Sequence, residues 1–259
     1  MTTLTQTSLV PTQIPLVEVD PWAYLLSDAH PKLLRSDKIH YLGSKPLRDR
    51  FHLGIIGTRR PNRESSPFLK NLLQELAKKI SFRVISGGAL GIDAQAHAEA
   101  LKLNVPTYAW IVGDPALPTP YSNHRLFKHL REQAGSAIIT PEVLYRPQNV
   151  GICAPFWVER NYWIAANCDV LLVVQAKKQS GTWWTVKACQ EFDIPIYAVP
   201  GDPMDPCFEG TNLMISNCYA NSVTSIDSLI EDLCRASRES AIMKVKESLR
   251  LSEELLERQ

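Results

Sequence analysis

The 259-residue chain is predicted to fold as an α/β protein with a mostly parallel sheet and helices on both of its faces. Short apolar runs alternate with segments of helical periodicity, as where residues 53–56 precede a helical pattern over 68–80. The run 169–176 is apolar along most of its length, which is typical of a strand buried on both faces of a parallel sheet.

The same alternation continues along the chain. Further strands are expected over residues 82–85, 104–112, 137–140 and 195–201, the last ending in a turn. Helices are expected over residues 94–101, 122–133 and 183–192. From Ser225 the pattern is again helical, with Ile226, Leu229, Ile230 and Leu233 on one stripe, and residues 243–256 are charged and amphipathic.

A glycine-rich loop lies between the strand 82–85 and the helix 94–101. Ser86, Gly87, Gly88 and Gly91 are its candidate phosphate-binding residues, since glycine lets the backbone approach a ligand and the helix start directs N–H groups at it. The spacing fits neither a dinucleotide fingerprint nor a Walker loop, which would need a lysine. A tight strand-to-helix turn without a ligand is the alternative.

Two more loops of this kind follow predicted strands. Gly57, Thr58 and Arg59 come after residues 53–56, and Lys177, Ser180, Gly181 and Thr182 come after residues 169–176. Ligands of open α/β sheets bind outside the carboxyl ends of the strands. We therefore predict one composite site, with Gly57, Gly88 and Ser180 at a common edge.

Cations and aromatic residues supply the chemistry expected of this site. The guanidinium groups of Arg59 and Arg160 suit phosphate, and Phe156 offers a ring on which a base can stack. Replacing either arginine by alanine is expected to weaken binding and leave the fold intact. The structural alternatives are that Arg160 pairs with Glu142 or Glu159, that Arg59 lies in solvent, and that Phe156 packs in the core.

Seven separated motifs come in an order that resembles the DprA/Smf family of DNA-processing proteins. They are Gly57–Arg59, Ser86–Asp93, Ala96–Leu101, Phe156 with Arg160–Asn161, Ser180–Thr182 with Thr185, Val199–Gly201 and Gly210–Asn212. The resemblance covers roughly residues 30–222. It implies an extended Rossmann-like core, single-stranded DNA as ligand, a homodimer, and loading of the RecA recombinase in natural transformation. It also adds Asn161 to the candidate binding residues.

Three parts are expected. The resemblance gives a core with a short lead-in over 30–222, the polar composition of 1–29 predicts a mobile N-terminal arm, and the helical pattern near the end predicts a C-terminal helical extension over 223–259. Gln175 stands where the family usually has glutamate. The wider superfamily includes lysine-decarboxylase-like proteins, so a nucleotide-binding or signalling domain and a nucleotide phosphoribohydrolase stay open. Glu142 is the one carboxylate expected at the edge, and it has no evident partner acid; we therefore expect no enzyme activity and no cofactor.

Composition narrows the classes of function that remain. The net charge is +1, so a nucleic-acid ligand would require a local basic patch. No apolar stretch approaches the roughly 20 residues of a membrane span, and a cytoplasmic protein is expected. The six cysteines form no C-x-x-C pair and the six histidines no metal pattern, so no metal site is predicted.

Overall fold

The computed structural model describes residues 16–18 and 38–257, and its nine strands form one sheet. The strand order is β1-β2-β6-β5-β4-β3-β7-β8-β9. All neighbours from β6 to β9 are parallel, whereas β2 pairs antiparallel with both β1 and β6. The strands are β1 Leu16–Glu18, β2 Lys38–Gly43, β3 Phe51–Ile56, β4 Phe82–Ser86, β5 Thr107–Trp110, β6 Ala137–Pro141, β7 Val170–Val173, β8 Ile196–Ala198 and β9 Asn221–Ser222.

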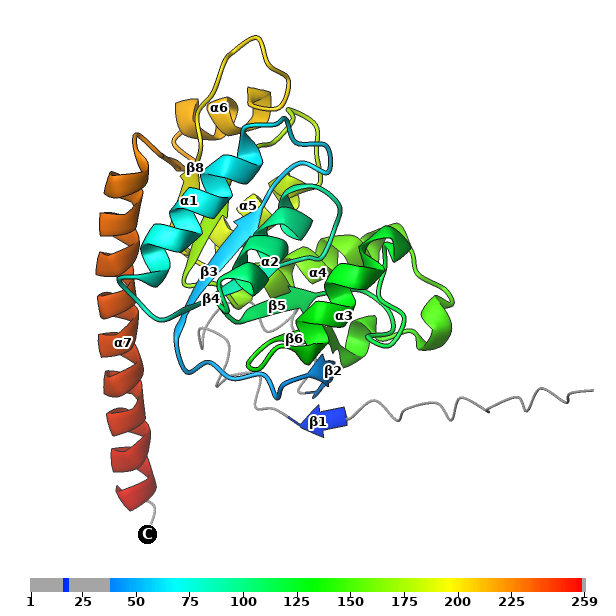
Figure 1. Ribbon diagram of the computed structural model, residues 1–259. Coiled ribbons are helices and arrows are strands. Elements are labelled where there is room, and N and C mark those ends of the chain that lie inside the picture. The colour runs from blue at the N-terminus through cyan, green and yellow to red at the C-terminus, as the bar shows by residue number, and fades with distance from the viewer. Residues whose placement is uncertain (1–15, 19–37, 258–259) are drawn as a thin grey trace, which may run out of the picture.

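Seven α-helices connect and flank these strands (Figure 1). They are α1 Ser65–Ala77, α2 Ile92–Lys102, α3 His124–Glu132, α4 Ala154–Ala166, α5 Thr182–Glu191, α6 Glu209–Ser216 and α7 Ile226–Glu257. Short 3₁₀ turns cover Tyr121–Asn123, Glu142–Leu144 and Pro147–Asn149. The predicted mostly parallel sheet with helices on both faces is confirmed.

Alternation along the central strands divides the core between the two faces of the sheet. On β3, Leu53 and Ile55 pack with α1, α2 and α7, whereas Ile56 packs with α4, α5 and α6. On β7, Leu172 belongs to the first cluster and Leu171 to the second. Each of these strands is buried along its whole length, as expected for a sheet covered on both sides.

The elements outside the sequence prediction include α4, α6 and β2. The second half of α4 is buried all round, so apolar and polar residues do not alternate with a helical period along it. This is why the sequence pattern did not predict α4. The last helix, α7, packs against α1 and β3 with Leu229, Ile230 and Leu233 and then runs past the body of the domain (Figure 1). Ser240 Oγ donates to Asp169 Oδ1 at 2.9 Å and Lys244 Nζ to the Arg50 carbonyl at 3.2 Å.

Most of the predicted 1–29 arm lies outside the described residues. The exception is β1, whose residue Val17 lies opposite Ile39 of β2. The three-part division of the chain stays a prediction.

Candidate functional site

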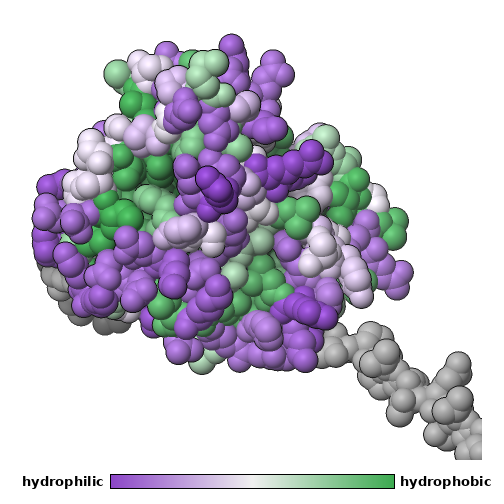
Figure 2. All heavy atoms as spheres, turned by 45° about the horizontal axis from the view of Figure 1, so that its top comes forward, coloured by the Kyte–Doolittle hydropathy of each residue, from purple (hydrophilic) through white to green (hydrophobic). Residues whose placement is uncertain are grey.

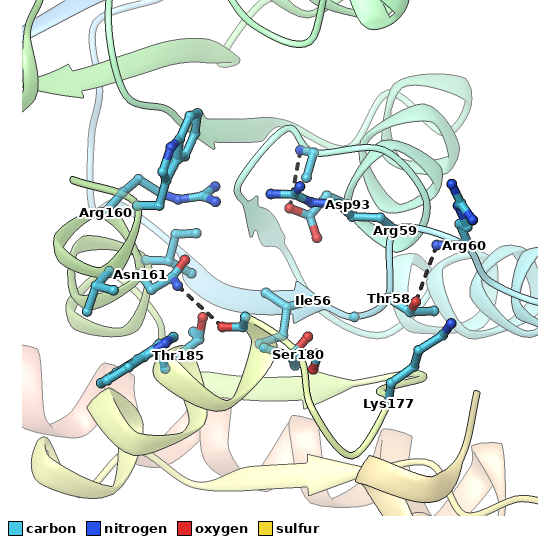
Figure 3. Close-up of a pocket in the computed structure, with 18 of the residues that line it drawn as sticks. Ile56, Thr58, Arg59, Arg60, Asp93, Arg160, Asn161, Lys177, Ser180 and Thr185 are labelled. Atoms are coloured by element: carbon cyan, nitrogen blue, oxygen red, sulfur yellow. Dashed lines mark hydrogen bonds between the residues drawn. The ribbon is translucent and has the colours of Figure 1, made fainter. Parts of the chain in front are cut away.

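A cavity of about 630 Å³ lies at the carboxyl edge of the sheet (Figure 3). Strand β3 pairs with β4 on one side and with β7 on the other, so the chain connections diverge at this point. Open α/β sheets bind ligands at such a switch point. The lining residues are Ile56, Gly57, Thr58, Arg59, Arg60, Ala89, Asp93, Ala154, Trp157, Val158, Arg160, Asn161, Ile164, Lys177, Ser180, Gly181, Thr182, Trp184 and Thr185.

Two of the three predicted loops contribute their candidate residues to this lining, together with two residues of α4. The candidates that lie there are Gly57, Thr58, Arg59, Arg160, Asn161, Lys177, Ser180, Gly181 and Thr182. The parallel pairing of β3, β4 and β7 brings all three loops to one edge, as predicted. What these residues bind stays a prediction.

The glycine-rich loop after β4 differs from its prediction as a phosphate cradle. The carboxylate of Asp93 accepts hydrogen bonds from the N–H groups of Gly87 at 3.2 Å and Ala89 at 3.3 Å. Asp93, an acidic group in the first helical turn, thus occupies two of the N–H donors that this loop would offer to a phosphate.

The four candidates of this loop have structural contacts and none lines the cavity. Ser86 is fully buried and donates to the Ile55 carbonyl, and the Gly87 carbonyl accepts from Arg160. Gly88 has a φ of +67° and its carbonyl accepts from the Asn123 amide. Gly91 has a φ of +79°, and a Cβ there would lie 2.3 Å from the Thr58 carbonyl oxygen. Close backbone packing therefore explains these residues.

Phe156 is the other candidate that the structure places elsewhere. On α4, Trp157, Arg160, Asn161 and Ile164 are spaced at three- and four-residue intervals and share the face toward the cavity. Phe156 lies one residue out of this phase, and its ring packs on the core with the Arg146 guanidinium 4.2 Å from its centroid. Trp157 occupies the place at the cavity that was predicted for Phe156.

Arg160 lies at the deep end of the cavity and is only 6% exposed. Its Nη1 donates to the carbonyl oxygens of Gly87 at 2.8 Å and Trp110 at 3.2 Å. Burial lowers the pKa of Arg160, and the nearby Asp93 carboxylate offsets part of this effect. Burial also raises the pKa of Asp93, against the opposing influence of Arg160.

Glu142 follows β6 at the carboxyl edge of the sheet, as predicted, but it has no part in the cavity. Glu142 instead hydrogen-bonds the ring of His40, and it does not line the cavity. Asp93 is the one carboxylate among the described lining residues. Its place in the first turn of α2, directly after the glycines, is the sequence signal that locates it.

The outer part of the cavity carries exposed cations and an indole. Arg59, Arg60 and Lys177 are exposed and come from the two loops that face one another across the opening (Figure 3). Trp184, near the start of α5, is 45% exposed and also lines the cavity. Trp183 packs on the core instead, so only one of these two adjacent indoles faces the site.

Two buried polar atoms of lining residues have no partner among the described residues. They are Arg160 Nε and Ser180 Oγ. Buried donors without a partner are rare in native proteins because each costs free energy, and they commonly mark a place that water or a ligand fills. These two atoms therefore favour a ligand that brings hydrogen-bond acceptors.

A hydrogen-bonded clamp holds the arginine loop after β3. Gln175 accepts from the Asn62 N–H at 3.0 Å and donates to its side-chain oxygen at 2.5 Å. Asn62 in turn donates to Asp205 at 2.8 Å, and Cys207 Sγ contacts the Arg60 carbonyl at 3.7 Å. Sequence patterns did not reveal this clamp because Asn62 is separated from Gln175 by 113 positions and from Asp205 by 143.

Within the described part of the chain, no group of His, Cys, Asp and Glu side chains is arranged to hold a metal ion. Among the described helices, none combines the length and the apolar character that crossing a membrane requires. When the top of Figure 1 is turned forward, hydrophilic and apolar residues are interspersed over the surface (Figure 2).

The family model described as DNA recombination-mediator protein A matches residues 25–234. The chain belongs to this family. It is 33% identical to the protein Smf of Synechocystis over 58% of this chain and 36% of that protein. It is 28% identical to the DNA processing protein DprA of Bacillus subtilis over 70% of this chain and 58% of that protein. The chain thus matches only about a third to three-fifths of the length of these relatives.

Solved structures of family members have the same fold. DNA processing protein A from Helicobacter pylori, which has a single-stranded DNA binding mode, is 26% identical with a TM-score of 0.70 over 87% of this chain and 97% of that chain. DprA from Streptococcus pneumoniae is 23% identical with a TM-score of 0.68 over 85% of this chain and 74% of that chain. The resemblance noted in the motifs is confirmed.

Proposed function

We propose that this chain binds single-stranded DNA at the cavity between the β3 and β7 loops, as a recombination mediator without catalytic activity. The observation that carries the proposal is the combination of exposed cations and two indoles in one cavity at the switch point of the sheet. Membership of the family and the Helicobacter pylori relative, which binds single-stranded DNA, support it.

The chemistry of the cavity suits the two parts of a nucleotide. Arg59, Arg60 and Lys177 offer positive charge to phosphates, and contacts of this kind dominate affinity for nucleic acid. Trp157 and Trp184 offer aromatic surface to unpaired bases. Stacking is tolerant of sequence because every base has a π-face, so we expect little sequence preference.

Hydrolysis of a nucleotide is less well supported by the same cavity. Asp93, its one described carboxylate, already accepts two backbone hydrogen bonds and lies beside a buried arginine. A glycosidic hydrolase typically uses two carboxylates at defined separation. The phosphoribohydrolase and the nucleotide-binding or signalling domain are therefore kept only as outcomes of the tests below.

Oligonucleotide titrations of the Arg59→Ala variant test the proposal. A charge-assisted hydrogen bond is worth about 1.5–3 kcal/mol, so the affinity should fall roughly tenfold or more. The salt dependence should flatten by about 0.7 in logarithmic slope for each single-strand phosphate that the protein no longer neutralises. Lys178→Ala is the matched control, because Lys178 is exposed in the neighbouring loop and does not line the cavity.

If Arg59→Ala binds like wild type at two salt concentrations, the cavity is not the nucleic-acid site. A free nucleotide would then be the ligand to examine, together with hydrolysis at Asp93.

We further propose that the protein acts as a cytoplasmic homodimer that passes its strand to a RecA-type recombinase. Exposed apolar residues between 164 and 219 support self-association: Met204 is 86% exposed and Tyr219 is 44% exposed. Light scattering at micromolar concentration is expected to give twice the 29.1 kDa monomer mass. A monomer mass throughout the titration would contradict the dimer.

A further inference from the structure

Helix α3 presents an unusually basic surface to solvent. Its exposed residues include Arg125, Lys128 and Arg131, and His124 and His129 are exposed as well. Glu132 is the only acidic residue of the helix. Phe127 and Leu130 hold the opposite side in the core. In a chain with a net charge of only +1, this helix is a local concentration of positive charge.

The charge on α3 is not neutralised within the described part of the chain. None of its three cations lies within ion-pair distance of a described acidic side chain. On other helices an acid one turn away pairs with a cation. These pairs are Lys78–Glu75, Lys102–Glu99, Lys187–Glu191 and Arg235–Asp232. The α3 cations thus keep their charge available to a partner.

Folding of the helix accounts for only part of this pattern. Arg131 and His129 lie in the last turn, where positive charge interacts favourably with the helix dipole. Arg125 lies in the first turn, where positive charge is unfavourable and no acidic residue is present to compensate it. A cation at this position therefore points to a role outside the helix.

The start of α3 is tied to the loop that borders the cavity. Asn123 donates through its side-chain amide to the carbonyl oxygens of Gly88 at 3.0 Å and Ala89 at 3.2 Å, and Ala89 lines the cavity. Next to it, Tyr121 is 81% exposed and its ring stacks on His124 with centroids 5.0 Å apart. Figure 1 shows α3 beside α2. Tyr121 thus presents an exposed ring beside the basic surface, two residues before Asn123, which contacts the loop that borders the cavity.

We propose that the exposed face of α3, with Arg125, Lys128 and Arg131, is a second contact surface for single-stranded DNA that continues the path of a strand held in the cavity. This inference rests on the proposed function. Unpaired cations with an exposed aromatic ring beside them match a flexible polyanion with free bases. An acidic surface of another protein is the alternative partner for these cations. Binding such a surface would not require α3 to lie next to the cavity, whereas binding a continuous DNA strand does.

The test compares a short and a long strand on wild type and on the double variant Arg125→Glu with Lys128→Glu. The probes are oligothymidylates of about four and about twenty residues, one at the lower end of the usual range of single-strand sites and one above it. The long strand should bind the variant about tenfold or more weakly, with a salt slope smaller by about 1.4 because two phosphates are no longer neutralised. The short strand should change by less than about twofold, since we expect it to be too short to reach α3 from the cavity.

The control carries the same change of charge on another part of the surface. Lys70→Glu with Lys79→Glu alters two exposed lysines, one on α1 and one just after it, and leaves the net charge equal to that of the α3 variant. Equal losses of affinity in the two double variants would show a general charge effect and overturn the α3 surface. An unchanged long-strand affinity in the α3 variant would overturn it as well.

Failure of the proposed function gives a different result from failure of the α3 surface. If wild type binds neither strand, single-strand binding itself is wrong, and the inference about α3 falls with it. If wild type binds both strands with the same affinity and the α3 variant is unaffected, the cavity alone holds DNA. Circular dichroism of both double variants checks that the fold is retained.

Discussion

Arg160 should contribute more to the stability of the fold than any other cation that lines the cavity. Arg160→Ala removes two charge-assisted hydrogen bonds, to the carbonyl oxygens of Gly87 and Trp110. Bonds of this type are worth about 1.5–3 kcal/mol each, so the two together are worth roughly 3–6 kcal/mol. The buried carboxyl group of Asp93 would in addition be left without its nearby cation.

A destabilisation of this size is a large fraction of the roughly 5–15 kcal/mol that stabilises a typical domain. The sequence expectation that Arg160→Ala leaves the fold intact is therefore revised. Urea unfolding followed by circular dichroism measures the free energy of unfolding, with Arg59→Ala as the exposed control that should change it by no more than about 0.5 kcal/mol. The contrary result would be an unfolding free energy of Arg160→Ala within about 1 kcal/mol of the wild-type value, which is the size of one hydrogen bond between uncharged groups. The two hydrogen bonds of Arg160 would then be weaker than the account requires.

His97, Gln175 and Gly57 each provide a further prediction. Burial lowers the pKa of His97 to about 3, so the unfolded chain binds a proton more readily than the folded one below the ordinary value of 6.5. The free energy of unfolding should therefore fall as the pH drops from 6.5 toward 5. His97→Gln should reduce the slope of this free energy against pH by about 1 kcal/mol per pH unit. An unchanged slope would show that His97 is not the group responsible. Gln175→Leu should weaken oligonucleotide binding about three- to tenfold because it releases the arginine loop. The slope of affinity against salt should stay the same, since no phosphate contact is removed. Replacement of the exposed Gln179 by leucine is the control and should have no effect. Equal binding by the two glutamine variants would contradict the clamp. Gly57→Ala should destabilise the fold by about 1–3 kcal/mol, since the new Cβ would lie 2.6 Å from Ile92 Cγ1. Gly181→Ala is the control and should be tolerated, because nothing lies within 4 Å of a Cβ there. The midpoints of urea unfolding compare the two variants, and equal midpoints would contradict the close packing at Gly57.

The sheet and the edge that carries the site were predictable because each follows from local patterns. Apolar runs such as 169–176 locate central strands, and parallel pairing places their carboxyl ends together. The exposed loop cations Arg59 and Lys177 follow directly from that geometry.

The interior of the site was less predictable because side-chain directions decide it. Nothing local shows that Asp93 turns back onto the N–H groups of its own loop, although its place in the first helical turn is a signal for capping. Without the phase of α4, the sequence could not distinguish Phe156 from Trp157. The partners of Arg160 lie 73 and 50 residues away, so its burial was also beyond sequence patterns.

The most direct test of the central claim is a competition titration on the wild-type protein at two salt concentrations. A labelled single-stranded oligonucleotide is displaced by unlabelled single strand, by duplex of the same sequence, or by free nucleotides at equal phosphate concentration. We predict that the single strand competes about tenfold or more better than either alternative, with affinity falling as salt rises. If free nucleotides displaced the probe as well as the single strand did, the cavity would be a nucleotide pocket and the claim would be wrong.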